Sequence, residues 1–246
     1  MLIVFSLFFM LLGSALGWWI IDELIHPDAA MLFLYGALSV SAAVLYVQGL
    51  LSIKAGNRLV PRLLLQGVFY VTMAWAALCL FLPLMFFQDL GGYTKLLFAC
   101  FVILFFLKNI HVSLRSEKAL WSRYGFGVFT NHLDIDNSSV DWEKVARSMD
   151  THRNVRAIGI PHRWHSVISK TMYTFAVAGL YVAGLYSVFA VMTWALPGTV
   201  IAGVMLQHAS HLFFQAYRVR LWERENGTTL KSAPFRHRKK RTQSSR

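Results

Sequence analysis

Four polar residues near the C-terminal end have the types and spacing to do chemistry together. His208, His211, Gln215 and Arg218 follow one another at intervals of three, four and three residues, which places them on one face of a helix. Histidines in such a stripe can bind a metal or a haem, carry protons or line a polar conduit. The same residues can equally form hydrogen bonds between helices. The spacing therefore predicts that the four residues share one helical face, and it leaves the function of that face open.

Ligand chemistry would need a third partner at a suitable depth. The nearest candidate is His111, which lies close to Lys108 and Asn109 near the end of another apolar run. It lies about two helical turns from His211 in predicted depth, too far for simple haem ligation by two histidines. We predict no cofactor. A site for iron, copper or haem at His111, His208 and His211 stays an alternative.

The segments that position these residues are membrane helices. The chain is 56% hydrophobic and only 15% charged, and its mean hydropathy is +0.49. About 20 apolar residues are enough to cross a hydrocarbon core of about 30 Å as a helix. The apolar runs are residues 2–21, 30–53, 63–87, 96–114, 167–196 and 199–222. The sequence thus predicts an all-α polytopic bundle of about six transmembrane helices.

Two details of this bundle depend on single sequence features. The first run ends in Gly17-Trp18-Trp19 and lacks a preceding base, so we expect a retained helix in place of a cleaved signal peptide. Only Pro197-Gly198 separates the fifth run from the sixth, which predicts a tight hairpin between them.

The lysines and arginines predict an orientation. All but one of the 24, Lys95, fall in segments that a single topology places on the same side. Because base-rich short loops stay in the cytoplasm, both termini are expected there. The compact loops and this charge rule favour a bacterial inner membrane. The predicted parts are a four-helix membrane region (1–114), a cytoplasmic insert (115–166), a helical hairpin (167–222) and a basic tail (223–246).

The insert is the one sizeable segment outside the predicted spans. We expect the fourth helix to continue toward Arg123 and to break at Gly125 and Gly127. A short amphipathic helix is predicted over 140–151, capped by the residues at 137–139. Its apolar face could lie on the membrane, on its own bundle or on a partner. The residues expected to dock are Trp142, Val145, Met149, Arg163 and Trp164.

The C-terminal tail ends in a run of bases. We expect it to be a disordered anchor that contacts anionic lipid headgroups. Nucleic acid is not expected as its partner, because no aromatic residues interleave with the bases. The bases concerned are Arg236, Arg238, Lys239, Lys240 and Arg241.

Motifs for common enzyme activities are missing from the sequence, and no acid lies well inside a predicted span. The resulting hypothesis is a non-catalytic integral inner-membrane subunit of a larger bacterial assembly, such as a secretion, conjugation or transport apparatus. Its expected partners are the lipid bilayer and other membrane subunits. One alternative is a histidine-liganded membrane metalloenzyme or haem-binding redox subunit. Another is a small oligomeric channel.

Overall fold

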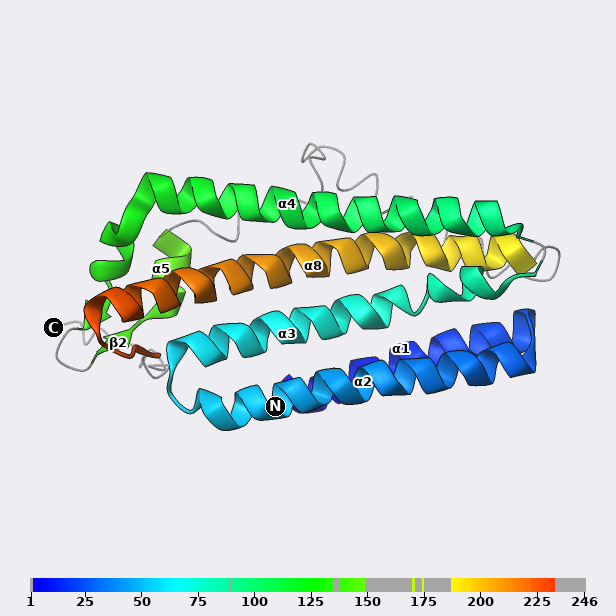
Figure 1. Ribbon diagram of the computed structural model, residues 1–246, viewed down its shortest axis with the longest axis horizontal. Coiled ribbons are helices and arrows are strands. Elements are labelled where there is room, and N and C mark those ends of the chain that lie inside the picture. Colours follow the sequence, from blue (N-terminus) through cyan, green and yellow to red (C-terminus); the bar gives the residue numbers. More distant parts are fainter. Residues whose placement is uncertain are drawn as a thin grey trace, which may run out of the picture.

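The structure, a computed structural model, describes residues 2–88, 90–134, 138–148 and 187–232, together with Lys170 and Thr174. Figure 1 shows a bundle of long helices with a small folded region at one end. The elements are α1 (Leu2–Leu24), α2 (Pro27–Ala55), α3 (Leu59–Leu78), the short 3₁₀ helix η1 (Leu82–Phe86), α4 (Gly92–Thr130), β1 (Leu133–Asp134), β2 (Ser139–Val140), α5 (Trp142–Ser148), α8 (Ser187–Asn226) and β3 (Lys231–Ser232).

Four helices are long and apolar enough to cross a membrane: α1, α2, α3 and the Gly92–Arg123 part of α4. Their outer surfaces are apolar, as Val4, Leu32 and Leu97 show with exposed fractions of 68%, 67% and 71%. Water would not favour so much exposed apolar surface, whereas lipid does. The predicted all-α character is confirmed, and four helices, where about six were predicted, have the length and composition of membrane spans.

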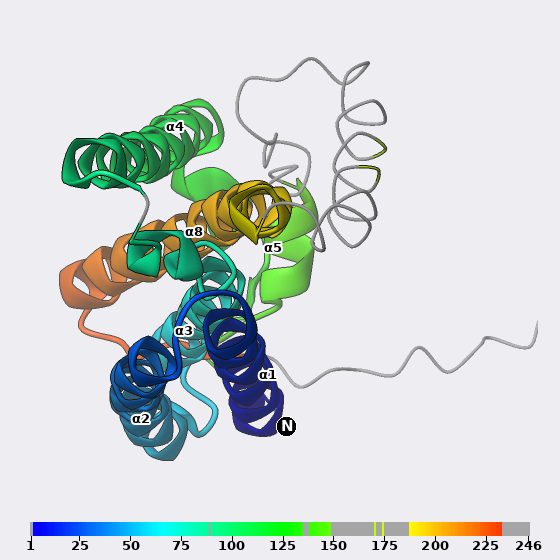
Figure 2. The ribbon, with the colours of Figure 1, turned by 90° about the vertical axis from the view of Figure 1, so that its right-hand side faces the viewer.

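Helices α3 and α8 form the centre of the bundle. Helix α8 packs against α3 on one side and α4 on the other, while α1 and α2 pack against each other and against α3. Figure 2, viewed along the helices, shows this arrangement end on. Because α8 is enclosed, its polar side chains face other helices, which explains why it is the least apolar of the long helices.

Two helices are too long for the bilayer alone. Both α4, with 39 residues, and α8, with 40, start at the same end of the bundle and run in the same direction. At 1.5 Å per residue each is about 60 Å long, about twice the thickness of a hydrocarbon core. A hydrocarbon core would therefore cover only about half of each helix; the end of the bundle where α5 and the strands lie is called the cap end below.

The predicted hairpin at Pro197-Gly198 is wrong. Both residues lie inside α8, which continues to Asn226. A Cβ atom on Gly198 would come within 2.6 Å of the backbone oxygen of Ala77, so this glycine is required where α8 crosses α3 closely. The Pro-Gly pair marks a packing contact and not a turn. The sixth predicted span is the later part of α8, and residues 167–169, 171–173 and 175–186 of the fifth lie outside the described residues.

The third predicted span is also not one helix. It ends as α3 at Leu78, and after a turn the chain forms η1. Pro83 explains the break, since a proline inside an α-helix lacks the donor N–H and collides with the carbonyl four residues earlier. Sequence length alone suggested a continuous run through this position.

The cap end is folded from segments that are far apart in the sequence. Strand β2 lies between β1, its antiparallel neighbour, and β3, its parallel neighbour. The turn before α3 joins the same network, because the Leu59 N–H donates to the Leu230 carbonyl at 2.9 Å and the Ser232 N–H to the Asn57 carbonyl at 2.7 Å. A shared core lies beneath, made of Leu59, Leu63, Trp121, Val140, Val145, Ala216, Val219 and Leu230. We call this unit the cap.

Several predictions for the insert need correction. Helix α4 passes through Gly125 and Gly127 and ends only at Thr130. The amphipathic helix exists as α5, but Asp141 caps it, accepting a hydrogen bond from the Lys144 N–H at 3.3 Å. The residues at 138–140 precede this cap, and the last two of them form β2.

Candidate functional site, a polar track between two parallel helices

The predicted stripe on α8 meets different partners along its length. His208 stacks on Tyr70 of α3, with ring centroids 5.0 Å apart and planes inclined by 17°. The Nδ1 atom of His211 contacts the Glu117 carboxylate of α4. Nearer the cap, the Arg218 guanidinium lies 5.5 Å from the centre of the Trp121 ring. The stripe is thus divided between α3 and α4 and does not converge on one point.

The strongest arrangement is the contact of His211 with Glu117 and Gln215. The Gln215 Nε2 atom lies 2.8 Å from Nε2 of His211, on the opposite side of the ring from Glu117. With the amide nitrogen donating there, the neutral ring accepts at Nε2, and its Nδ1 faces the Glu117 carboxylate. Both ring nitrogens are therefore engaged within this chain.

Burial makes this contact important for the stability of the α4–α8 interface. The Glu117 side chain is 1% exposed and that of His211 is 12% exposed. A buried charge is costly unless it is paired, and removing one partner of such a pair costs about 3–5 kcal/mol. The pair therefore links the two helices just before they enter the cap.

The face of α4 that receives this stripe is polar as well. Asn109, Ser113, Glu117 and Trp121 are four residues apart and all are buried. The Ser113 hydroxyl donates to the carbonyl of Gln207 on α8 at 2.9 Å. We call the buried polar residues of this interface the α4–α8 track. The sequence signal for its α4 half is a four-residue spacing, which like the three-four-three spacing on α8 places residues on one helical face.

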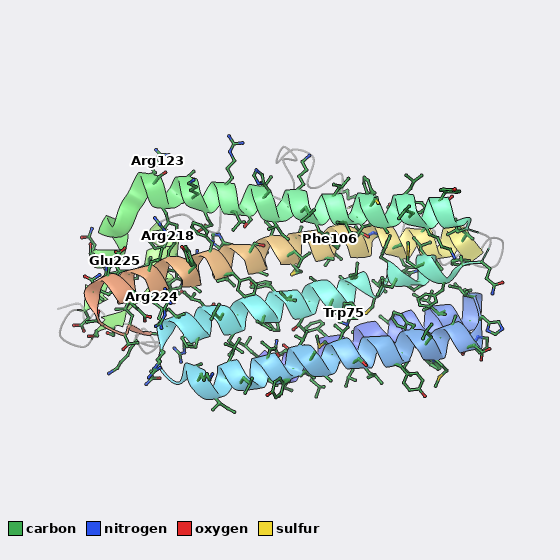
Figure 3. All side chains as sticks on the ribbon, viewed as in Figure 1. Trp75, Phe106, Arg123, Arg218, Arg224 and Glu225 are labelled. Carbon is green, nitrogen blue, oxygen red and sulfur yellow. The ribbon has the colours of Figure 1, made fainter. Side chains whose placement is uncertain are left out.

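The Glu117–His211 pair lies far from the end of the bundle at which α4 and α8 start. Glu117 and His211 are about 24 residues from the starts of α4 and α8, which places the pair about 37 Å from the opposite end of the bundle. If the hydrocarbon core begins at the first turn of α4, it ends after about 30 Å, before this pair. Figure 3 shows Arg123, Arg218, Arg224 and Glu225 still closer to the cap end, and Trp75 and Phe106 in the body of the bundle. Glu117 thus escapes the full cost of a charge in lipid.

The alternative metal set does not come together. His111 is on the exposed face of α4, away from the buried face that carries Glu117. Among the described residues, no group of three histidine, cysteine or acidic side chains could hold a metal ion. A metal at His211 would also have to displace Glu117 or Gln215.

A second buried polar cluster was not predicted. The Gln48 side chain on α2 donates to the Ser6 hydroxyl on α1 at 2.8 Å and to the Thr72 hydroxyl on α3 at 3.0 Å. Thr72 in turn donates to the carbonyl of Val68 at 3.0 Å. All three side chains belong to fully buried residues. Single polar residues in separate apolar runs give no periodic signal, so the sequence could not reveal their contact.

Two of the residues predicted to dock on a partner or the membrane pack within the protein itself. Val145 is fully buried in the core of the cap, and Trp142 packs against that core. This face of α5 is therefore covered by the protein's own bundle, and its assignment as an external docking surface is wrong. Met149, Arg163, Trp164 and the tail bases from Arg236 to Arg241 lie outside the described residues.

One exposed titratable group at the cap is perturbed. The hydrogen bond and charge of the Lys144 ammonium, 2.9 Å from Asp141, hold the pKa of that carboxyl below its ordinary value. The pair stabilises the first turn of α5, with the acid at the helix N-terminus.

Comparisons with family models, curated proteins and solved structures find no match to this chain.

Proposed function

We propose that this protein is a non-catalytic integral subunit of a larger assembly in a bacterial inner membrane, with the cap serving as its docking platform in the cytoplasm. The observation that carries the proposal is the construction of the cap. Main-chain hydrogen bonds join the turn at Asn57–Leu59, strand β2 and strand β3. Short loops that only connect helices need no such shared sheet and core, whereas a binding platform does.

The charge distribution supports the proposed orientation. Bases such as Arg58, Arg123 and Arg224 are at the cap end, while Asp22 and Asp28 are at the opposite end. The positive-inside rule then assigns the cap and both termini to the cytoplasm.

The α4–α8 track fits a structural role better than the two alternatives. A metal or haem site would need free imidazole nitrogens, but Glu117 and Gln215 engage both nitrogens of His211. A channel would need its polar lining to face an open path. Here His208 stacks on Tyr70, and His211 faces Glu117.

The surface available to partners consists of the exposed charged side chains of the cap. Glu143 and Lys144 project from α5, and Arg224 and Glu225 from the end of α8. Charged side chains at the rim of an interface determine which partners can approach. We therefore expect partner subunits to carry complementary charges at the same membrane level.

The test is native mass spectrometry on the affinity-tagged full chain, purified gently from its own membrane. We expect other subunits in a fixed ratio, and at least a tenfold loss of them in the double variant Arg224→Glu with Lys144→Glu. The matched control is Asp28→Lys, a charge reversal at the opposite end, which should keep the partners. A lone chain, or a homo-oligomer with the added mass of iron, copper or haem, would refute the proposal.

A further inference from the structure

The outer face of α4 carries a row of bases. Lys108, His111, Arg115 and Lys118 follow at intervals of three, four and three residues, and all four are exposed. They lie on the opposite face from Glu117 and the rest of the α4–α8 track. One helix therefore has a buried polar face and an exposed basic face within the same few turns.

The neighbouring surface toward the middle of the membrane is apolar. Phe101, Leu104 and Leu107 precede the bases and are 61%, 65% and 56% exposed. At 1.5 Å per residue, Lys108 is about 24 Å and Arg115 about 35 Å from the start of α4. With the hydrocarbon boundary at about 30 Å, the row begins just inside the core and ends among the headgroups.

A lysine at this depth needs a compensating charge. Cations inside the hydrocarbon region are costly, and they usually pair, or extend toward the headgroups. None of the four bases has an ion-pair partner among the described residues, whose ion pairs involve other side chains. The counter-charge must therefore come from outside the described part of the chain.

We propose that this face binds one anionic phospholipid in the cap-side leaflet, with its phosphate between Lys108 and Arg115 and its acyl chains along Leu104 and Phe101. The order of residue types along α4 matches the order of groups in a phospholipid. The apolar side chains lie at the level of the acyl chains, and the bases lie at the level of the headgroup. The site depends only on the membrane placement of α4, and it stands apart from the proposed role as a subunit.

An acidic helix from another protein is the competing occupant. It would have to present a carboxylate inside the hydrocarbon core opposite Lys108, which is costly for the partner as well. A lipid phosphate reaches the same lysine at the headgroup level, because the lysine side chain extends toward it. The observations therefore favour a lipid.

The experiment measures how many phosphatidylglycerol molecules the purified full chain retains in native mass spectrometry, against phosphatidylcholine at equal concentration. We expect one retained phosphatidylglycerol in the unaltered protein. The double variant Lys108→Gln with Arg115→Gln should retain it about 25-fold less, since each base near the headgroups contributes about fivefold.

The control variant, Lys54→Gln with Arg62→Gln, removes the same charge from exposed bases elsewhere at the cap end and should leave retention unchanged. The conservative variant Lys108→Arg should also keep the lipid, and far-ultraviolet circular dichroism confirms that each variant is folded. Equal losses in the control would mean unspecific charge attraction and would overturn the site. Unchanged lipid retention in the double variant would also overturn the site. So would the finding that the unaltered protein carries an acidic protein in place of lipid and that the double variant loses this protein.

Discussion

Two buried polar clusters hold this bundle together, and they differ in kind. Ser6, Gln48 and Thr72 join α1, α2 and α3 through neutral hydroxyl and amide groups. Glu117 and His211 join α4 and α8 through ionisable groups. The neutral cluster lies among three helices that are apolar enough to span the membrane, whereas the ionisable one lies about 37 Å along α4 and α8, next to the cap.

The difference follows from the solvent around each cluster. Inside lipid, a neutral hydrogen bond satisfies a polar side chain without the cost of burying a charge. Near the boundary, a carboxylate with a histidine partner can be accommodated, and it links the membrane helices to the cap. We infer that the neutral cluster sets the register of α1, α2 and α3, and that the charged pair fixes the cap on the bundle.

The largest expected effect is that of His211→Ala. It leaves the Glu117 carboxylate buried without its partner, so the free energy of unfolding should fall by about 3–5 kcal/mol. Chemical unfolding in mixed micelles, followed by circular dichroism, measures the change. The double variant Glu117→Gln with His211→Gln removes the buried carboxylate together with its imidazole partner and should recover most of the loss. If the single variant is as stable as the unaltered protein, the pair does not hold α4 to α8.

A smaller effect is expected for Gln48→Leu, which keeps the volume and removes two hydrogen bonds. At about 0.6 kcal/mol per bond in membranes, the loss should be about 1 kcal/mol. Ser6→Ala, which removes one of the two bonds, should lose about half as much in the same unfolding assay. A loss for Gln48→Leu equal to that for His211→Ala would erase the distinction between the clusters.

The smallest effect concerns the exposed pair of Asp141 and Lys144 at the surface of the cap. Because Lys144 lowers the pKa of Asp141 in the folded protein, the stabilisation is fully present above the ordinary value of 3.8 and is lost as the pH falls through the lower folded value. Solvent screening keeps it below about 0.5 kcal/mol. Asp141→Asn should remove this pH dependence in unfolding experiments between neutral and acidic pH. If Asp141→Asn changed the free energy of unfolding as much as His211→Ala, burial would not determine the size of these effects.

Apolar run length predicted the ends of α1 and α2 to within three residues, because a bilayer constrains helix length and composition, but it covered only about half of α4. Residue spacing likewise predicted that His208, His211, Gln215 and Arg218 share one face of a helix. Predictions failed where a local signal had two physical meanings. The pair Pro197-Gly198 is typical of a turn, yet Gly198 is needed because α8 packs closely against Ala77 there.

The partners of the polar stripe could not be predicted for a different reason. Glu117 lies just beyond the fourth apolar run, so by sequence it belonged to the soluble insert. Only the parallel packing of α4 and α8 brings it to His211. Strand β3 illustrates the same limit, since its contact with β2 connects residues about 90 positions apart in the sequence.

The measurement that tests the account most directly is sided labelling of single cysteines in intact cells, in a Cys100→Ala background. An impermeant maleimide added outside should label Asp28→Cys and should not label Lys144→Cys on the cap until the membrane is opened. That result places the folded, base-rich cap in the cytoplasm. Labelling of Lys144→Cys in intact cells would put the cap outside and contradict the proposed orientation and docking role.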